Sequence, residues 1–303
     1  MATPAELRFA VAERDETRAD KRTQAPAVLS RNASLFRVSG PSSRRLLIVN
    51  KGPGAAKIAR EGRSWDLMEI FWHKDDIDAI VADPSLSKAD HLVFESDRRI
   101  RKLGIIKRLF ARNPVFWSYD VVMMADDDLY PIGCTIKDIF DLFETTGQRV
   151  GQPALTRDSY WAHDITLRDD RFRWRKTNFV EVMCPIMTRE ALQDYIGVFD
   201  ETAGHGLDEY WSQIECGRHG GLAVLDATPV RHTRPVQSGA AYEGVSAGEE
   251  GRTFLARYRL KRRLNVAFAG ELSTNRTIQT GMNIVVRSYV RGIVSRASRR
   301  LSH

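Results

Sequence analysis

Three consecutive aspartates, Asp126, Asp127 and Asp128, follow the apolar segment at residues 120–125 of this 303-residue sequence. Neighbouring carboxylates repel one another, and moving them out of water is costly unless a positive group lies among them. Oxygen ligands without adjacent histidine or thiolate suit hard cations such as Mg²⁺ or Mn²⁺, whose shell is commonly completed by substrate phosphates. The alternative is a helix cap, but one cap needs only one Asp. The segment therefore favours a metal site.

The elements that must position these aspartates form an α/β pattern. Short apolar runs at residues 46–49, 67–72 and 91–95 precede the run at 120–125, and segments of crossover length separate them. Such spacing predicts a parallel sheet. The run at 120–125 shows no alternation, which is typical of a central strand covered by helices on both faces. Because open parallel sheets bind ligands at the carboxyl ends of their strands, the aspartates lie where a ligand is expected.

The pattern resembles a known fold. An apolar strand ending in an Asp-x-Asp-type motif is similar to the GT-A glycosyltransferase fold, in which the motif holds a divalent cation against the diphosphate of a nucleotide-sugar. Five segments between residues 44 and 236 also resemble, in order and spacing, an uncharacterised GT-A-like domain family whose plant members are labelled "lysine-ketoglutarate reductase trans-splicing related". They are "YDVVMMADDDLYP", "GQPALTRDSYWAHDITLR", "FVEVMCPIMTREAL", "GLDEYWS" and "RHTRP".

The resemblance implies a metal centre and its neighbours. Asp126 and Asp128 would hold the cation, with Asp127 nearer the sugar or ribose. A histidine after a late strand often completes the metal shell in GT-A enzymes, and His232 follows such an apolar run. His219 is the weaker alternative, and a structural role for either histidine stays open.

The motif "GHGLDEYW" resembles the acidic acceptor-site motif at the start of a helix in many GT-A enzymes. It would place Asp208 or Glu209 beside the transfer centre, and in an inverting enzyme one of them would remove the proton of the acceptor hydroxyl. A helix cap after Gly206 is the alternative interpretation. We favour Asp208 as the base and keep Glu209 as the adjacent alternative.

Four further residues are expected to contact the substrate. Trp161 and His163 stand in an aromatic and basic stretch, and aromatic rings provide flat surfaces on which sugars pack. Lys102 and Lys107 lie on the basic face of an amphipathic helix predicted within residues 98–112. They would help to neutralise the leaving diphosphate.

Positive charge is concentrated in the last part of the chain. The net charge is +7, yet residues 251–303 carry twelve Lys and Arg against one acid, so the preceding residues are slightly acidic. A basic balance confined to a tail indicates an appended contact surface, and nucleic acid is not an expected partner. We expect a mobile leader at 1–40, a GT-A-like catalytic domain at 41–240 and a basic, largely helical extension at 241–303.

The tail also contains a candidate amphipathic helix from Met282 to Val294, with arginines opposite its apolar residues. Packing on the domain is the default expectation, and peripheral binding to an anionic membrane is the second. The three cysteines show no paired spacing, which fits a reducing compartment. The sequence also has no signal-like or membrane-spanning run, so we expect a cytoplasmic protein.

The sequence thus predicts a metal-dependent transferase that uses a nucleotide-sugar donor and a glycan or glycolipid acceptor, with Mn²⁺ or Mg²⁺ as cofactor. A non-catalytic scaffold of the same fold, which binds a partner or an anionic membrane through its tail, is the alternative. A phosphohydrolase or nuclease is disfavoured because no second cluster of carboxylates and histidines has suitable spacing. Donor, acceptor and stereochemical outcome stay open.

Overall fold

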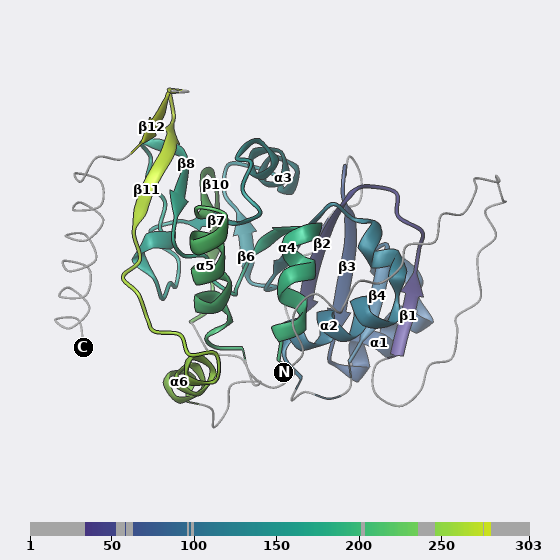
Figure 1. Cartoon of the computed structure of the whole chain (residues 1–303). Helices are drawn as coiled ribbons and strands as arrows, with labels where there is room; N and C mark the ends of the chain where they lie inside the picture. Colours follow the sequence, from purple (N-terminus) through teal and green to yellow (C-terminus); the bar gives the residue numbers. More distant parts are fainter. Residues whose placement is uncertain are drawn as a thin grey trace, which may run out of the picture.

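The computed structural model describes residues 34–52, 58, 63–95, 97, 100–200, 204–235, 246–274 and 276–279. These residues form a twelve-stranded sheet flanked by helices (Figure 1). The strand order is β1-β4-β3-β2-β5-β9-β7-β10-β8-β11-β12, and β6 pairs with β10. The strands are β1 (Ser34–Val38), β2 (Arg45–Lys51), β3 (Asp66–Phe71), β4 (His91–Phe94), β5 (Val121–Ala125), β6 (Leu129–Pro131), β7 (Val150–Leu155), β8 (Phe172–Thr177), β9 (Ile186–Thr188), β10 (Leu222–His232), β11 (Ala267–Leu272) and β12 (Thr277–Gln279). The α-helices are α1 (Lys74–Ala82), α2 (Lys102–Arg112), α3 (Ile136–Thr145), α4 (Arg189–Tyr195), α5 (Leu207–Arg218) and α6 (Ala247–Arg257).

The centre of the sheet is mostly parallel. Strands β4, β3, β2 and β5 are parallel neighbours in that order. The short strand β9 runs antiparallel between β5 and β7, and β10 is parallel to β7. Consequently β7 and β10 point in the same direction as the first four strands. The expected α/β class with a mostly parallel central sheet is confirmed.

Helices on both faces explain why the central strands read as continuous apolar runs. In β2, Leu46 and Ile48 pack in a core with residues of α2, α4 and α5, whereas Leu47 and Val49 pack in a second core with residues of α1 and α3. All five residues of β5 are buried as well. A strand with no solvated face needs apolar side chains at every position.

Strands of the sheet occur in both of the expected end segments. Within the expected leader, β1 pairs with β4, while residues 1–33 lie outside the described residues. Within the expected helical extension, α6 is followed by β11 and β12, which continue the sheet from β8. The candidate helix from Met282 to Val294 lies outside the described residues. In the part that is described, no helix is long and apolar enough to cross a bilayer.

Candidate active site

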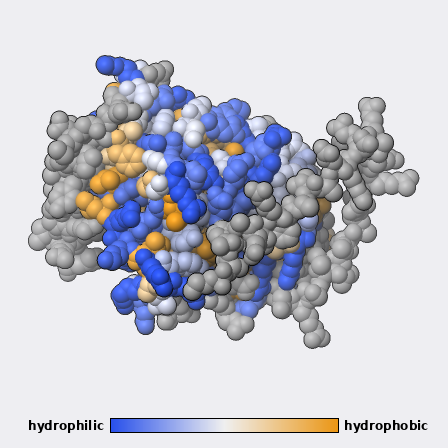
Figure 2. Space-filling view, in the orientation of Figure 1, coloured by the Kyte–Doolittle hydropathy of each residue, from blue (hydrophilic) through white to orange (hydrophobic). Residues whose placement is uncertain are grey.

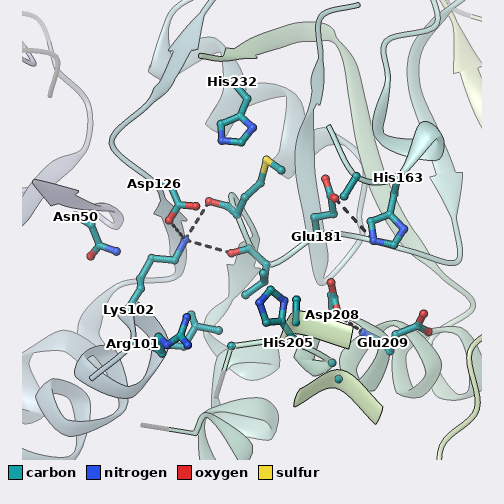
Figure 3. A pocket seen from close by; sticks show the side chains of 18 of the residues that line it. Asn50, Arg101, Lys102, Asp126, His163, Glu181, His205, Asp208, Glu209 and His232 are labelled. Carbon is teal, nitrogen blue, oxygen red and sulfur yellow. Dashed lines mark hydrogen bonds and ion pairs between the residues drawn. The ribbon is translucent and has the colours of Figure 1, made fainter. Parts of the chain in front are cut away.

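A cavity of about 1120 Å³ opens at the carboxyl ends of the central strands (Figure 3). Residues at or after the ends of β2, β3 and β5 line it, among them Asn50, Trp72 and Asp126, and the end of β10 adds His232. The first turn of α5 and the segment at 262–265 complete the wall. The cavity therefore lies where open parallel sheets bind their ligands.

Asp126 contacts the side chain of Lys102, which reaches it from α2. Lys102 Nζ donates to Asp126 Oδ1 at 2.7 Å and to three main-chain carbonyl oxygens, those of Met124 at 3.2 Å, Val182 at 3.2 Å and Met183 at 3.0 Å. Burial raises the pKa of Asp126, and the charge of Lys102 acts against that rise. Lys102 lines the cavity, with its amine surrounded by oxygens.

Asp127 is fixed by Gly52 and Arg234. Its Oδ2 atom accepts a hydrogen bond from the Gly52 amide at 2.7 Å, and its Oδ1 atom forms an ion pair with Arg234. A Cβ atom at Gly52 would stand 2.8 Å from Asp127 Oδ2, so a side chain there would displace the carboxylate. The end of β2 therefore holds the middle aspartate through its backbone.

Asp128 pairs with His232 because two strands meet at this point. Strand β6 begins directly after Asp128 and pairs with β10, so that Leu129 stands opposite His232. His232 Nε2 lies 3.0 Å from Asp128 Oδ2, and its Nδ1 lies 2.6 Å from the Tyr160 carbonyl oxygen. Burial disfavours the charged form of both side chains, but their attraction for each other outweighs this effect. Arg234 Nε, 3.1 Å from Asp128 Oδ2, further favours the charged form of Asp128. The pKa of Asp128 is lowered and that of His232 is raised.

The donor atoms of Asp126, Asp128 and His232 decide whether a metal ion fits at this place. In the described ranges, no three His, Cys, Asp or Glu side chains converge into a ready metal cluster. However, Asp128 Oδ1 is buried and accepts no hydrogen bond there, and Asp126 turns only Oδ1 toward Lys102. The Tyr160 carbonyl also orients His232 in the way that second-shell groups orient metal-binding histidines. This oxygen-rich donor set fits Mg²⁺ or Mn²⁺.

Asp208 and Glu209 lie in the cavity wall at the first turn of α5. Burial raises the pKa of Asp208 to about 6, and burial together with the charge of Asp208 raises the pKa of Glu209 to about 7. Asp208 Oδ1 also accepts the Glu209 amide at 2.9 Å, so a role at the helix start coexists with exposure to the cavity. Carboxyl groups with such pKa values can exchange protons near neutral pH.

The two predicted aromatic contacts are divided between cavity and core. His163 lines the cavity, its ring packed on Phe179 with centroids 4.3 Å apart and its Nε2 atom 3.9 Å from a carboxylate oxygen of Glu181 (Figure 3). Trp161 does not belong to the cavity lining among the described residues, and instead packs against the second hydrophobic core. The structure thus places Trp161, which was predicted to contact the substrate, outside the described lining and partly buried against that core.

Lys107 and His219 also lie elsewhere. The Lys107 amine donates to the carbonyl oxygens of Gly197 at 2.7 Å and Phe199 at 3.1 Å, so it secures a turn rather than the cavity wall. His219 follows the last residue of α5, at the opposite end of that helix from Asp208, and contacts Arg149. Neither residue is part of the described cavity lining.

Sequence reasoning missed Asn50, Glu181 and Arg234, all of which line the cavity. A sequence signal for Arg234 was present, because Arg234 stands two residues after His232 and carries the positive charge that a cluster of aspartates requires. Asn50 ends an apolar run at a strand terminus, which is the expected position for a ligand contact. Glu181 carried no distinguishing pattern.

No protein-family model matches the sequence, and no curated protein matches it. Among solved structures, the chain is similar to residues 1–349 of TarS from S. aureus in complex with UDP-GlcNAc, with 12% identity and a TM-score of 0.44. That alignment covers 70% of this chain and 65% of TarS 1–349. A second structure of TarS 1–349 gives 12% identity and a TM-score of 0.41 over 62% of this chain and 60% of that one. The chain thus spans less than two thirds of the length of these structures.

Proposed function

We propose that the chain is a GT-A-type glycosyltransferase that transfers a sugar from a nucleotide-sugar to an acceptor hydroxyl in the cavity. One observation carries this proposal. The same cavity holds a cluster of aspartates with basic partners at the end of β5 and, at the start of α5, two carboxyl groups with raised pKa values. The first arrangement suits a diphosphate bound with its cation, and the second suits removal of a proton.

On the donor side, Asp126, Asp128 and His232 would hold Mn²⁺ or Mg²⁺. When bound, such a cation neutralises charge that develops on the leaving diphosphate. The chain's own residues hold this region in place: Lys102 fixes Asp126, and Arg234 contacts the other two aspartates. These contacts fix the orientation of the aspartates, and preorganised groups of this kind favour catalysis. His232 would bind the cation through Nε2, in place of its contact with Asp128 Oδ2.

On the acceptor side, we propose Asp208 as the base that takes the proton of the acceptor hydroxyl, with Glu209 as its neighbour. A base needs its proton-free form at the working pH, and a pKa of about 6 leaves Asp208 mostly ionised near neutral pH. Glu209, with a pKa of about 7, titrates close to the same range.

The test is a panel of UDP-, GDP- and dTDP-sugars offered to the purified chain with Mn²⁺. We expect release of the nucleoside diphosphate, or a metal-dependent rise in melting temperature, for at least one donor. Asp126→Asn with Asp128→Asn should abolish either response, whereas Asp78→Asn, an exposed substitution in α1, should leave it intact. Flat responses across the panel would contradict the proposal, and release of inorganic phosphate would indicate a phosphohydrolase instead.

One observation favours a second candidate, a non-catalytic binding protein of this fold. Lys102, Arg234 and His232 already balance much of the charge of the three aspartates without a metal ion. Such a protein would bind a nucleoside diphosphate and release no sugar under any condition of the panel. Binding measured by calorimetry without turnover would therefore select this candidate.

A further inference from the structure

The second half of α6 and the segment that follows it bring positive charge to the edge of the cavity. Residues 252–263 include six Arg or Lys and no acidic residue. The surface around α6 is accordingly mostly hydrophilic in the view of Figure 2. Two of these residues, Arg262 and Arg263, are exposed and also line the cavity.

Arg262 and Arg263 form no ion pair or hydrogen bond through their guanidinium groups with any residue in the described part of the chain. Two other basic side chains nearby are engaged: Arg257 lies 3.4 Å from a carboxylate oxygen of Asp200, and Lys102 is surrounded by oxygens. Two guanidinium groups at a cavity edge are therefore available to a ligand.

The backbone that carries these arginines is held on both sides. Gln213 Nε2 donates to the Lys261 carbonyl oxygen at 2.9 Å. Asn178 contacts the other side, since its Nδ2 donates to the Leu264 carbonyl oxygen at 2.8 Å and its Oδ1 accepts the Val266 amide at 2.7 Å. A fixed backbone lowers the entropy that the two side chains lose when they bind a ligand.

Arg262 and Arg263 line the same cavity as Asp208 and Glu209, and Arg262 Nη2 and His205 Cβ both lie within 4 Å of the Cβ position of Gly251. The charge of Arg262 acts against the rise in the pKa of both carboxyl groups, and the charge of Arg263 acts against that of Glu209. A hydroxyl placed at these carboxyl groups would therefore share one cavity with both guanidinium groups. An anionic substituent on the acceptor is the natural partner for them.

We propose that Arg262 and Arg263 bind a phosphate group of the acceptor, next to the hydroxyl that receives the sugar. The proposal rests on the proposed function, because it names the acceptor of that reaction. Guanidinium groups bind phosphate oxygens in forked pairs. Two of them offer more N–H donors than a single carboxylate accepts, whereas a phosphate group, even as a diester, has four oxygens against the two of a carboxylate. The phosphate belongs either to a soluble phosphodiester or to a lipid headgroup.

The experiment uses the full chain and the double variant Arg262→Gln with Arg263→Gln. Its matched control is Arg259→Gln with Lys261→Gln, which removes the same charge from exposed residues of the same segment that do not line the cavity. Three ligands are measured: labelled inorganic polyphosphate by anisotropy, phosphatidylglycerol vesicles by sedimentation, and UDP, GDP and dTDP with Mn²⁺ by calorimetry.

The cavity variant should lose at least about tenfold in affinity for polyphosphate or for the vesicles, since a hydrogen bond to a charged group contributes about a factor of ten. The control should change less than about twofold, and nucleoside diphosphate affinity should be unchanged in both. Loss with polyphosphate supports a soluble acceptor, and loss with vesicles alone supports a lipid.

Three results would overturn the inference: equal losses in the cavity variant and the control, weaker nucleoside diphosphate binding in the cavity variant, or no binding of polyphosphate and vesicles by the unmodified chain. Failure of the proposed function looks different. In that case no nucleoside diphosphate binds, while polyphosphate or vesicle binding that depends on Arg262 and Arg263 persists.

Discussion

Lys102 Nζ lies 2.7 Å from Oδ1 of Asp126, and this contact joins α2 to the end of β5. The lysine side chain is only 9% exposed, and its other acceptors are main-chain carbonyl oxygens. The chain therefore supplies part of the positive charge that a run of three aspartates requires. Arg234 and His232 supply more of it at Asp127 and Asp128.

Lys102→Met should lower the free energy of unfolding by roughly 2 to 3 kcal/mol, because it leaves Asp126 without its cation in the cavity wall. This loss is smaller than that expected for a fully buried pair, since the Asp126 side chain is 37% exposed. Adding Asp126→Asn should restore about half of the loss or more. Urea unfolding of both variants measures this, and equal stability of the single and double variants would contradict a charge-pair role.

Gly52→Ala should weaken nucleoside diphosphate binding by about tenfold with little change in stability. The new Cβ atom would stand 2.8 Å from Asp127 Oδ2 and so push this carboxylate from its place between Gly52 and Arg234. Calorimetric titration provides the measurement. Gly40→Ala is the control, because nothing lies within 4 Å of its Cβ position. An equal loss of nucleoside diphosphate affinity in Gly40→Ala would contradict a specific effect on Asp127.

Local sequence patterns were sufficient for the core of the fold. The run predicted at 120–125 is β5, and the helix predicted within 98–112 is α2. Both rest on signals that reside in neighbouring residues, namely an unbroken apolar run and a spacing of three to four residues. The position of the aspartates at a strand end follows directly from them.

The orientation of single side chains could not be read in the same way. Lys102 and Lys107 share one basic helix, yet only Lys102 lines the cavity. Similarly, the segment that forms β11 lies in the extension that was expected to be largely helical, but the edge of β8 offers it backbone partners. Tertiary pairing of this kind overrides local preference, which is why strand propensity depends strongly on context.

Glu209→Gln should reduce the pH dependence of stability. The pKa of Glu209 in the folded protein is about 7, above its ordinary value of 4.5, so the folded state holds this proton more tightly than the unfolded state. The resulting stabilisation is fully present below about pH 4.5 and is lost as the pH rises through about 7.

Urea unfolding at several pH values between about 4.5 and 8 checks this sign. The unmodified chain should become less stable across that range, and the Glu209→Gln variant should show a smaller decline. The exposed residue Glu190 provides the control substitution Glu190→Gln, which should leave the original slope unchanged. A slope that is the same in all three proteins would contradict the raised pKa of Glu209.

Asn50→Ala should leave stability nearly unchanged and weaken nucleoside diphosphate binding. Asn50 is 9% exposed at the end of β2, and its Oδ1 atom is buried without a hydrogen-bond partner in the described ranges (Figure 3). Removing an unsatisfied group relieves a desolvation cost, whereas removing a bonded one costs about 1 to 3 kcal/mol.

Gln152→Ala is the contrasting variant, because the buried Gln152 Oε1 accepts the Glu181 amide at 2.6 Å. We expect urea unfolding to show a clear loss for Gln152→Ala only, and calorimetry to show an approximately tenfold loss of nucleotide affinity for Asn50→Ala. Equal destabilisation of the two variants would contradict an unsatisfied Asn50 amide. Unchanged nucleotide affinity in Asn50→Ala would show that this amide does not contact the nucleotide.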